Sequence, residues 1–354
     1  MEDLQLYKEL ARHLDQGIIG SPKSRALMEI LEILFPVEEA EIAVRLPMQN
    51  KTLSELKGIL PEKAKWLEET LNRMAKRGTV YTSQRQGQER KYRLLPSIVG
   101  WAETPFWAGK NTEYTRKLAP LWLKYREEAF GAELARGDMP VMRVIPVSRT
   151  LQDTRKVLPF DELKPKIEAA SYRAVAHCPC RMIARSLGEG CDHTLEVCLH
   201  FGAMGRYMVE YGMAREITVE ETLNILKKAN EEGLVHTIDN IEGYMSTICN
   251  CCGCCCVFLD TKKKMRLHTL SSSNYLSEVD IDKCDGCGTC EERCPMGAIA
   301  VTVNCIAEVN ESICIGCGVC TTTCSNEAVD LVQRAQVKAP PDLGEFMTKR
   351  YKEA

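Results

Sequence analysis

The chain has 354 residues, enough for two or three domains at a usual size of roughly 100 to 200 residues each. Its 46 Lys and Arg residues nearly balance 49 Asp and Glu residues, and the formal charge of −3 excludes the strongly basic surface of a nucleic-acid coat protein. All 19 cysteines fall between Cys178 and Cys324, so one part of the chain carries an unusual chemistry.

The amino-terminal stretch MEDLQLYKEL is acidic and amphipathic, whereas a secretory leader is first basic and then apolar. No apolar run approaches the roughly 18 residues that a membrane span requires. We therefore expect a cytoplasmic protein with no membrane span. In a reducing compartment, an odd number of cysteines is better explained by metal binding than by disulfides.

Residues 21–95 show the periodicity of successive helices followed by a hairpin. One apolar stripe predicts a first helix, and a second helix is expected over 37–46. A capping box of Thr52 and Glu55 starts a third helix, and a fourth, over 64–77, ends at Gly78. The segments VYTSQ and KYRLL predict two strands on either side of a turn. The apolar stripe of the first helix consists of Leu27, Ile30, Leu31 and Leu34.

This order of elements resembles a winged-helix domain, which we expect over residues 1–95. In that family the last helix enters the DNA major groove and the hairpin contacts phosphate. Against DNA, Glu62, Glu68 and Glu69 would repel a polyanion from the reading helix, and winged helices also bind proteins. Both partners stay open, with DNA the less favoured. The hairpin residues suited to DNA or partner contact are Arg85, Arg90, Lys91 and Arg93.

Residues 96–170 are expected to connect this domain to the cysteine-rich part of the chain. Residues 114–133 are predicted to be helical, and Pro140, Pro146, Pro159 and Pro165 punctuate extended segments and short turns. The sequence contains no P-loop and no GxGxxG, GxSxG or HExxH motif. Nucleotide-phosphate chemistry and the common hydrolase mechanisms therefore have no basis in it, and no catalytic residue is assigned.

Residues 171–270 are expected to form a mainly helical, cysteine-rich domain. Two groups of cysteines, which begin with HCPCR and end with CNCCGCCC, flank residues 201–248. That stretch is predicted to be helical, with a capping box at Thr218 and Glu221 and a helix end at Gly233. A hairpin of helices would bring the two groups together. They supply ten candidate metal ligands: Cys178, Cys180, Cys191, Cys198, Cys249, Cys251, Cys252, Cys254, Cys255 and Cys256.

Ten thiols suffice for one further [4Fe-4S] cluster or for two, and we expect ligands from both groups. The spacing does not assign individual ligands, and zinc is the alternative for the same thiols. An iron with an open position would instead bind substrate, beside His177, His193 and His200. The HCPCR and CNCC elements are similar to those of little-characterised multi-cluster iron–sulfur proteins of anaerobes. This similarity implies electron transfer but no substrate.

A duplication ends the cysteine-rich part of the chain. The segment IDKCDGCGTCEERCPMGAI at residues 281–299 recurs thirty positions later as ESICIGCGVCTTTCSNEAV. Each copy contains C-x2-C-x2-C-x3-C. Three thiolates two residues apart wrap around one iron cube, whereas the fourth starts a helix that points away and serves a different cluster. A zinc module is the alternative, which the repeated four-cysteine spacing disfavours.

This pattern resembles the bacterial two-[4Fe-4S] ferredoxins over residues 275–335. The resemblance implies that the first cluster is held by Cys284, Cys287, Cys290 and Cys324, and the second by Cys314, Cys317, Cys320 and Cys294. Pro295 fits the family pattern, whereas Ser325 departs from it. Cys305 has no place in the pattern and is expected to be a small buried hydrophobic residue. Glycines between ligands let backbone N–H groups approach cluster sulfur; they are Gly286, Gly288, Gly316 and Gly318.

Together these features predict an α+β multidomain protein. Its expected parts are a winged-helix-like domain (1–95), a connector (96–170), a mainly helical cysteine-rich domain (171–270), an α+β ferredoxin domain (271–335) and a tail (336–354). The tail is expected to form a short helix on a partner or to fray.

The predicted function is single-electron transfer, as a carrier or subunit of an anaerobic oxidoreductase more than as a stand-alone enzyme. The expected partner is a redox protein such as a flavoprotein. Two alternatives stay open: a redox-responsive winged-helix transcription regulator, and a reductase whose middle-domain cluster binds substrate.

Overall fold

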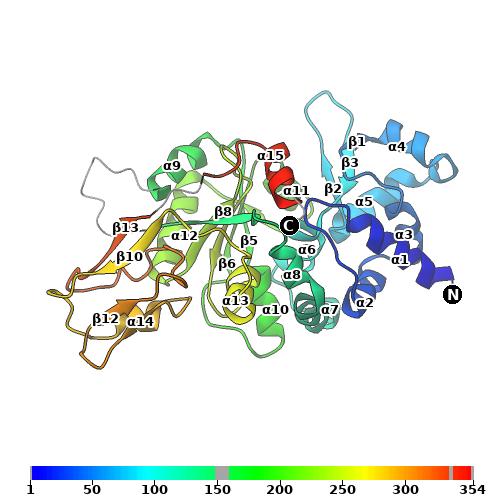
Figure 1. Cartoon of the computed structure of the whole chain (residues 1–354). Helices are drawn as coiled ribbons and strands as arrows, with labels where there is room; N and C mark the ends of the chain where they lie inside the picture. Colours follow the sequence, from blue (N-terminus) through cyan, green and yellow to red (C-terminus); the bar gives the residue numbers. More distant parts are fainter. Residues whose placement is uncertain (1, 148–158, 335–337, 352–354) are drawn as a thin grey trace. The chain divides into compact units, whose positions relative to one another are not determined.

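The computed structural model describes residues 2–147, 159–334 and 338–351 (Figure 1). The chain divides into two compact units. The first comprises Met1–Glu133, Ala176–Gly190 and Ala203–Arg215, and the second comprises Leu134–Val175, Cys191–Gly202 and Glu216–Ala354. Within the described residues, no helix combines the length and the apolar character needed to cross a bilayer.

The first unit begins with short helices and a small sheet. The helices are α1 (Glu2–Leu14), α2 (Arg25–Leu34), α3 (Val37–Ala43), α4 (Leu53–Ile59) and α5 (Leu67–Arg77), with the turn η1 (Pro61–Lys63) between the last two. The strands β1 (Lys51–Thr52), β2 (Val80–Ser83) and β3 (Lys91–Leu94) form an antiparallel sheet in the order β1-β3-β2.

Local sequence signals account for these elements. The Ser24 side chain accepts a hydrogen bond from the Leu27 amide at the start of α2, whose predicted apolar stripe is buried. Thr52 and Glu55 form the expected capping box of α4, and α5 ends at Gly78 with φ of 85°. The helices and hairpin predicted for residues 21–95 are present. The winged-helix assignment itself stays a prediction.

The rest of the first unit comes from later stretches of the chain. The residues expected to be a connector form η2 (Ser97–Trp101), α6 (Thr104–Trp107), α7 (Glu113–Tyr125), η3 (Arg126–Phe130) and α8 (Gly131–Leu134). Two more helices, α10 (Pro179–Ser186) and α11 (Gly202–Glu210), follow the first cysteines. Helix α7 packs against α2 and α10. The buried Tyr207 hydroxyl of α11 donates to the Ala75 carbonyl of α5 at 3.0 Å.

The second unit is built on a six-stranded sheet with the order β4-β8-β9-β6-β5-β7. Its strands are β4 (Met142–Ile145), β5 (Arg173–His177), β6 (Glu196–Phe201), β7 (Arg215–Glu216), β8 (Val235–Asp239) and β9 (Thr247–Cys251). Strand β8 pairs antiparallel with β4 and β9, and β9 pairs antiparallel with β6. Helices α9 (Pro159–Ala169) and α12 (Val219–Glu231) bury their apolar residues, such as Ile167 and Leu226, against this sheet. Helix α13 (Val257–Met265) follows the cysteine run.

The duplicated segment closes the second unit with two small antiparallel ribbons (Figure 1). Strand β10 (Tyr275–Val279) pairs with β13 (Val329–Gln333), and β11 (Ile299–Val301) pairs with β12 (Ala307–Val309). The short helix α14 (Thr289–Arg293) carries one end of the first cysteine loop. Pairing of the first ribbon joins the segment before repeat one to the end of repeat two, so the two repeats form one structure.

Residues 201–248 differ from the expected hairpin of helices. Strand β8 lies within this stretch, and β9, which pairs with β8, begins at its end. Thr218 does cap α12, and Gly233 follows it with φ of 79°. The strands VHTID and TICNC are rich in β-branched residues but buried on both faces, so they lack the alternation that reveals a half-buried strand. Residues 201–248 therefore contain strands of a sheet in a stretch that the sequence predicted to be helical.

Three further expectations need correction. Cys305 is exposed rather than buried, because it occupies the turn between β11 and β12 with φ of 58°. Pro159 and Pro165 lie within helix α9 rather than in extended segments. The tail forms α15 (Leu343–Arg350), which packs on its own chain: the Arg350 guanidinium is fully buried and donates to the Arg136 and Met139 carbonyls.

Candidate metal centres

The structure places Cys294, the last cysteine of repeat one, with the cysteine loop of repeat two. A small pocket beneath β11 and β12 is lined by Cys294 together with Cys314, Cys317 and Cys320. Burial raises the pKa of Cys320 to about 12, partly offset by the Ser277 hydroxyl at 3.2 Å, and the nearby Cys294 and Cys314 thiols raise it further. This juxtaposition is the one that the ferredoxin resemblance implies for the second cluster. The ligand assignment stays a prediction.

Three of the four ligands expected for the first cluster belong to one apolar cluster. Cys290 is buried in a cluster with Ile299 and Cys320, and Cys284 and Cys324 pack against it. Burial raises the pKa of Cys290, and the neighbouring thiols of Cys284 and Cys287 act in the same direction. Thiols held this close remain protonated until a cation takes them as thiolates, which is the condition for metal binding.

Backbone amides point at several of these sulfurs, a feature that the sequence analysis did not predict for these positions. The Ala298 amide donates to Cys294 Sγ at 3.2 Å, and the Ala328 amide donates to Cys324 Sγ at 3.2 Å. The Ala307 amide approaches Cys284 Sγ at 3.4 Å. Such bonds stabilise a negatively charged thiolate and tune the potential of a cluster that it ligates. The amide-to-sulfur bonds of Ala298 and Ala328 occupy equivalent positions of the two repeats.

The four predicted glycines all have positive φ, between 64° and 79°. At Gly286 a Cβ would lie 2.2 Å from the Cys305 carbonyl oxygen, and at Gly316 it would lie 2.0 Å from the Tyr275 carbonyl oxygen. The loops therefore need glycine for two reasons: the left-handed backbone and the chain packed directly behind it. Approach of the amides to cluster sulfur, the reason expected from the sequence, stays a prediction.

A second group of cysteines converges in the middle of the chain. Cys191, just before β6, meets three residues of the loop after β9: Cys252, Cys254 and Cys255. Their sulfur atoms all lie within 4.8 Å of one another. Cys252 and Cys255 are buried, and burial raises the pKa of Cys254 to about 12, with Cys252 acting in the same direction. As expected, this group combines an upstream cysteine with the downstream run.

The other candidate cysteines of the middle segment have different surroundings. Cys198 Sγ lies 3.2 Å from His200 Nε2, and Cys251 Sγ lies 3.8 Å from Thr237 Oγ1. Cys249 and Cys251 belong to strand β9, and Cys256 precedes α13. Cys178 and Cys180 belong to the first unit, where the hydrogen bond between these two thiols, together with burial, raises the pKa of Cys178. Within the described residues, none of these six thiols joins the group of four.

The histidines near the cysteines do not join that group either. Burial lowers the pKa of His200 to about 3, and its Nδ1 lies 3.3 Å from the Thr247 hydroxyl. His193 Nδ1 lies 3.4 Å from a Glu232 carboxylate oxygen. His177 lies behind Gly109 in the first unit, where a Cβ on the glycine would touch its ring. The described part of the chain thus offers sulfur, rather than nitrogen, as the donor at this site.

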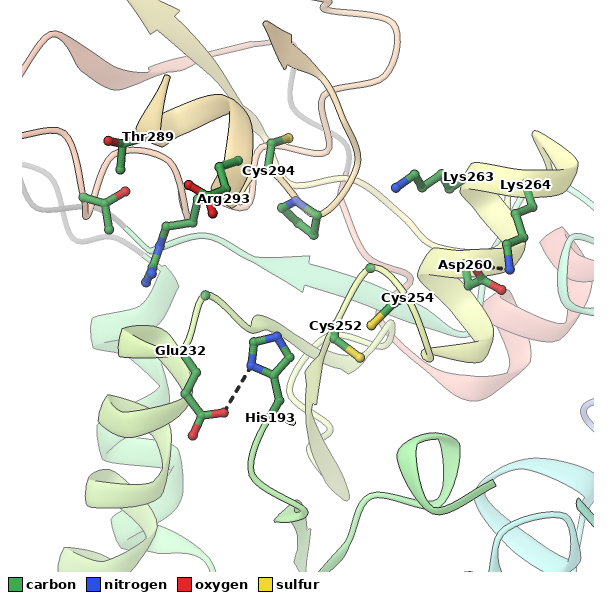
Figure 2. A pocket seen from close by; sticks show the side chains of 15 residues that line it. His193, Glu232, Cys252, Cys254, Asp260, Lys263, Lys264, Thr289, Arg293 and Cys294 are labelled. Atoms are coloured by element: carbon green, nitrogen blue, oxygen red, sulfur yellow. Dashed lines mark ion pairs between the residues drawn. The ribbon is translucent and has the colours of Figure 1, made fainter. Parts of the chain in front are cut away.

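The cysteine group of four adjoins the ferredoxin segment across a pocket of about 710 Å³ (Figure 2). Cys252 and Cys254 line one part of this pocket, and Cys294 lines another. Between the first two, Gly253 touches the ferredoxin loop directly, since a Cβ there would lie 2.1 Å from the Pro295 carbonyl oxygen. Pro295 follows Cys294 in the chain, so the two cysteine sites are separated by one loop contact.

Charged side chains on the pocket wall form contacts both between elements and within one helix. The Arg293 guanidinium donates to the Asn230 and Glu231 carbonyls at 2.8 and 2.7 Å, and so caps the carboxyl end of α12. On the other side, Lys264 Nζ lies 3.1 Å from Asp260 Oδ1, as the dashed line in Figure 2 marks. Arg293 directly precedes Cys294, so these hydrogen bonds attach the chain next to Cys294 to helix α12.

The basic hairpin of the first unit is partly engaged by its own chain. Arg90 Nη1 lies 2.6 Å from Glu210 Oε1 and donates to the Tyr211 hydroxyl at 3.0 Å. The Arg93 guanidinium lies over the Tyr81 ring at 4.6 Å. Arg85 and Lys91 are exposed. These contacts of Arg90 and Arg93 compete with the phosphate contacts that DNA binding would require.

Comparison with known proteins addresses the cysteine repeats directly. Residues 277–300 match the family model described as a 4Fe-4S binding domain. The matched segment runs from β10 into β11 and contains the four cysteines of repeat one. No match was found among curated proteins or among solved structures. The domain match supports an iron–sulfur, electron-transfer role, and the cysteine group of four offers a further place for a metal.

Proposed function

We propose that the chain relays single electrons through two [4Fe-4S] clusters in residues 271–335, as a carrier or a subunit of an anaerobic oxidoreductase. The observation that supports this most strongly is the pocket that Cys294 shares with Cys314, Cys317 and Cys320. Each cluster carries one electron by a change of iron valence, while amide-to-sulfur bonds and burial set its potential. Transfer of this kind needs no proton-donating side chain.

The two loops differ in exposure, which supports a role for each. Cys287 in the first loop is exposed, whereas Cys317 and Cys320 in the second are buried. The second loop lies against the sheet domain, where the Val147 amide donates to the Cys317 carbonyl at 2.9 Å. We infer that the first cluster exchanges electrons with an external redox protein. The second cluster would then pass electrons between the first cluster and the interior of the protein.

The acidic surface around the first loop suits a redox partner whose docking face is basic. Asp282 and Asp285 are exposed beside Cys287, and the Asp285 carboxylate accepts a hydrogen bond from the Cys287 amide at 3.2 Å. Negative charge at an exposed electron-transfer edge attracts a positively charged partner and raises the encounter rate at low ionic strength. A flavoprotein with a basic face fits this description.

The experiment mixes anaerobically reduced full-length chain with oxidised cytochrome c, a basic one-electron acceptor, and follows haem absorbance by stopped flow. We expect rapid reduction that Asp282→Lys slows several-fold at low salt, with the difference lost at high salt. Glu220→Lys makes the same charge change at an exposed position of α12 and should leave the rate unchanged. Failure of the reduced chain to reduce cytochrome c would contradict the proposal.

A further inference from the structure

The sulfur atoms of the cysteine group of four lie unusually close together. Cys191 Sγ lies 3.8 Å from both Cys252 Sγ and Cys255 Sγ, and Cys254 Sγ lies 3.6 Å from Cys255 Sγ. Every pair within the group is closer than 4.8 Å. The four sulfurs therefore form one compact group, in which none lies apart from the others.

This spacing distinguishes a single ion from an iron–sulfur cube. Four thiolates at about 2.3 Å from one tetrahedral ion lie about 3.8 Å from one another. In a [4Fe-4S] cube each thiolate binds a different iron and points away from the cube, so the four thiolates lie farther apart. Three of the separations, at 3.6–3.8 Å, agree with the single ion, and the other pairs lie within 4.8 Å.

The ferredoxin cysteines provide a comparison within the same molecule. Across the described residues, no three of those eight thiols approach one another as closely as the members of the group of four do. Cys294, Cys314, Cys317 and Cys320 instead surround a pocket. The thiols predicted to hold cubes are thus spaced more widely than the members of the group of four.

We propose that Cys191, Cys252, Cys254 and Cys255 bind one tetrahedral metal ion, zinc or mononuclear iron, in place of the [4Fe-4S] cluster expected from the sequence. Four thiolates fill every position of such an ion, so the site is closed and offers no open position to a substrate. This disfavours the alternative of a substrate-binding cluster formed by these four residues. The proposal concerns a site that the electron relay of residues 271–335 does not use, and it stands independently of it.

The bound ion has a structural consequence. It ties Cys191, five residues before β6, to the loop after β9, and that loop carries Gly253 against Pro295 of the ferredoxin segment. Binding energy of a structural ion adds to folding energy, so the ion stabilises the surface on which the second cluster loop rests. Four thiolates and a divalent ion leave two negative charges, and Lys263 lines the same pocket.

The test compares zinc, iron and acid-labile sulfide in the anaerobically purified full-length chain and in the double variant Cys252→Ser/Cys255→Ser. We expect the variant to lose one ion per chain, zinc or iron, with no loss of sulfide. Loss of about four irons with about four sulfides would show a cube and overturn the proposal. An unchanged metal content would overturn it as well.

Two matched variants localise the ion. Cys305→Ser removes an exposed thiol outside every group, and Cys249→Ser removes a thiol of the same run that lies outside the group of four. Both should keep the ion, and its loss from Cys249→Ser would contradict the assignment. If the double variant does not fold, X-ray absorption of the wild-type chain decides. If the ion is zinc, its absorption edge should show four sulfur neighbours at about 2.3 Å and no neighbouring metal. If the ion is iron, the same result is expected at the iron edge, measured after the labile clusters have been removed from the chain.

The outcome separates this proposal from the electron relay. One ion in a chain that lacks ferredoxin iron would support the tetrahedral site and contradict the relay. Eight ferredoxin irons without the extra ion would do the reverse.

Discussion

At the scale of single residues, backbone amides donate hydrogen bonds to cysteine sulfurs that are predicted cluster ligands. The Ala298 and Ala328 amides donate to Cys294 and Cys324, the two cysteines that the crossed arrangement exchanges between repeats. Both bonds run from a sulfur to the amide four residues later, so the duplication preserved the amide donor together with the ligand. Removal of the sulfur would leave this amide without its acceptor as well as the cluster without a ligand.

In the second cysteine loop, glycine at position 316 is required both by its left-handed backbone and by strand β10 packed behind it. Gly316→Ala places a methyl group against the Tyr275 carbonyl, whereas Gly288→Ala has nothing within 4 Å. Both substitutions strain a left-handed backbone by about 1–2 kcal/mol, and only the first also displaces the chain behind the loop. We expect Gly316→Ala to lower the iron content and the midpoint of anaerobic thermal unfolding more than Gly288→Ala does. Equal effects would show that the contact with Tyr275 does not position the loop.

At the scale of elements, helix α12 links the sheet domain to the ferredoxin segment. Its amino end is capped by Thr218, and its carboxyl end is capped from outside by Arg293 of α14. A helix whose terminal carbonyls accept from a distant arginine transmits the position of one element to the other. The residue that follows Arg293 is Cys294, so this cap sets where the exchanged ligand lies.

Arg293→Ala removes two charge-assisted hydrogen bonds and should cost about 1.5–3 kcal/mol, measured as a lower urea midpoint of the anaerobic, cluster-loaded chain. Arg293→Lys keeps the charge without the planar fork and should recover only part of the loss. Lys228→Ala, at an exposed position in the last turn of the same helix, should change stability by no more than about 0.5 kcal/mol. A similar urea midpoint for Arg293→Ala and Lys228→Ala would show that the Arg293 hydrogen bonds do not stabilise the chain.

The sequence predicted elements best where local signals are strong. The Thr52 and Glu55 box, the stripe of α2 and the Thr218 cap each depend on neighbouring residues, and each forms as expected. Strands β8 and β9 were missed because they are buried on both faces. The convergence of Cys191 with the run after β9 depends on the order of strands in the sheet, which no local pattern contains.

At the scale of the whole molecule, each unit contributes a separate property. The first unit carries the helices and basic hairpin, whose winged-helix character and partner stay predictions. The second unit combines the sheet, the cysteine group of four and the ferredoxin segment. Within this unit the exposed first loop, the buried second loop and the contact of Gly253 with Pro295 form a continuous series from the surface to the group of four.

The central claim is that the two repeats exchange their fourth cysteine, and two double variants test it with electron paramagnetic resonance and iron analysis. If the arrangement is crossed, Cys294→Ala/Cys314→Ala removes two ligands from one cluster and leaves the other complete. The account predicts loss of about four irons and one intact [4Fe-4S] signal on reduction. Cys284→Ala/Cys294→Ala should instead damage both clusters. The reverse result, with one intact cluster only in Cys284→Ala/Cys294→Ala, would show that each repeat holds its own cluster and would contradict the account.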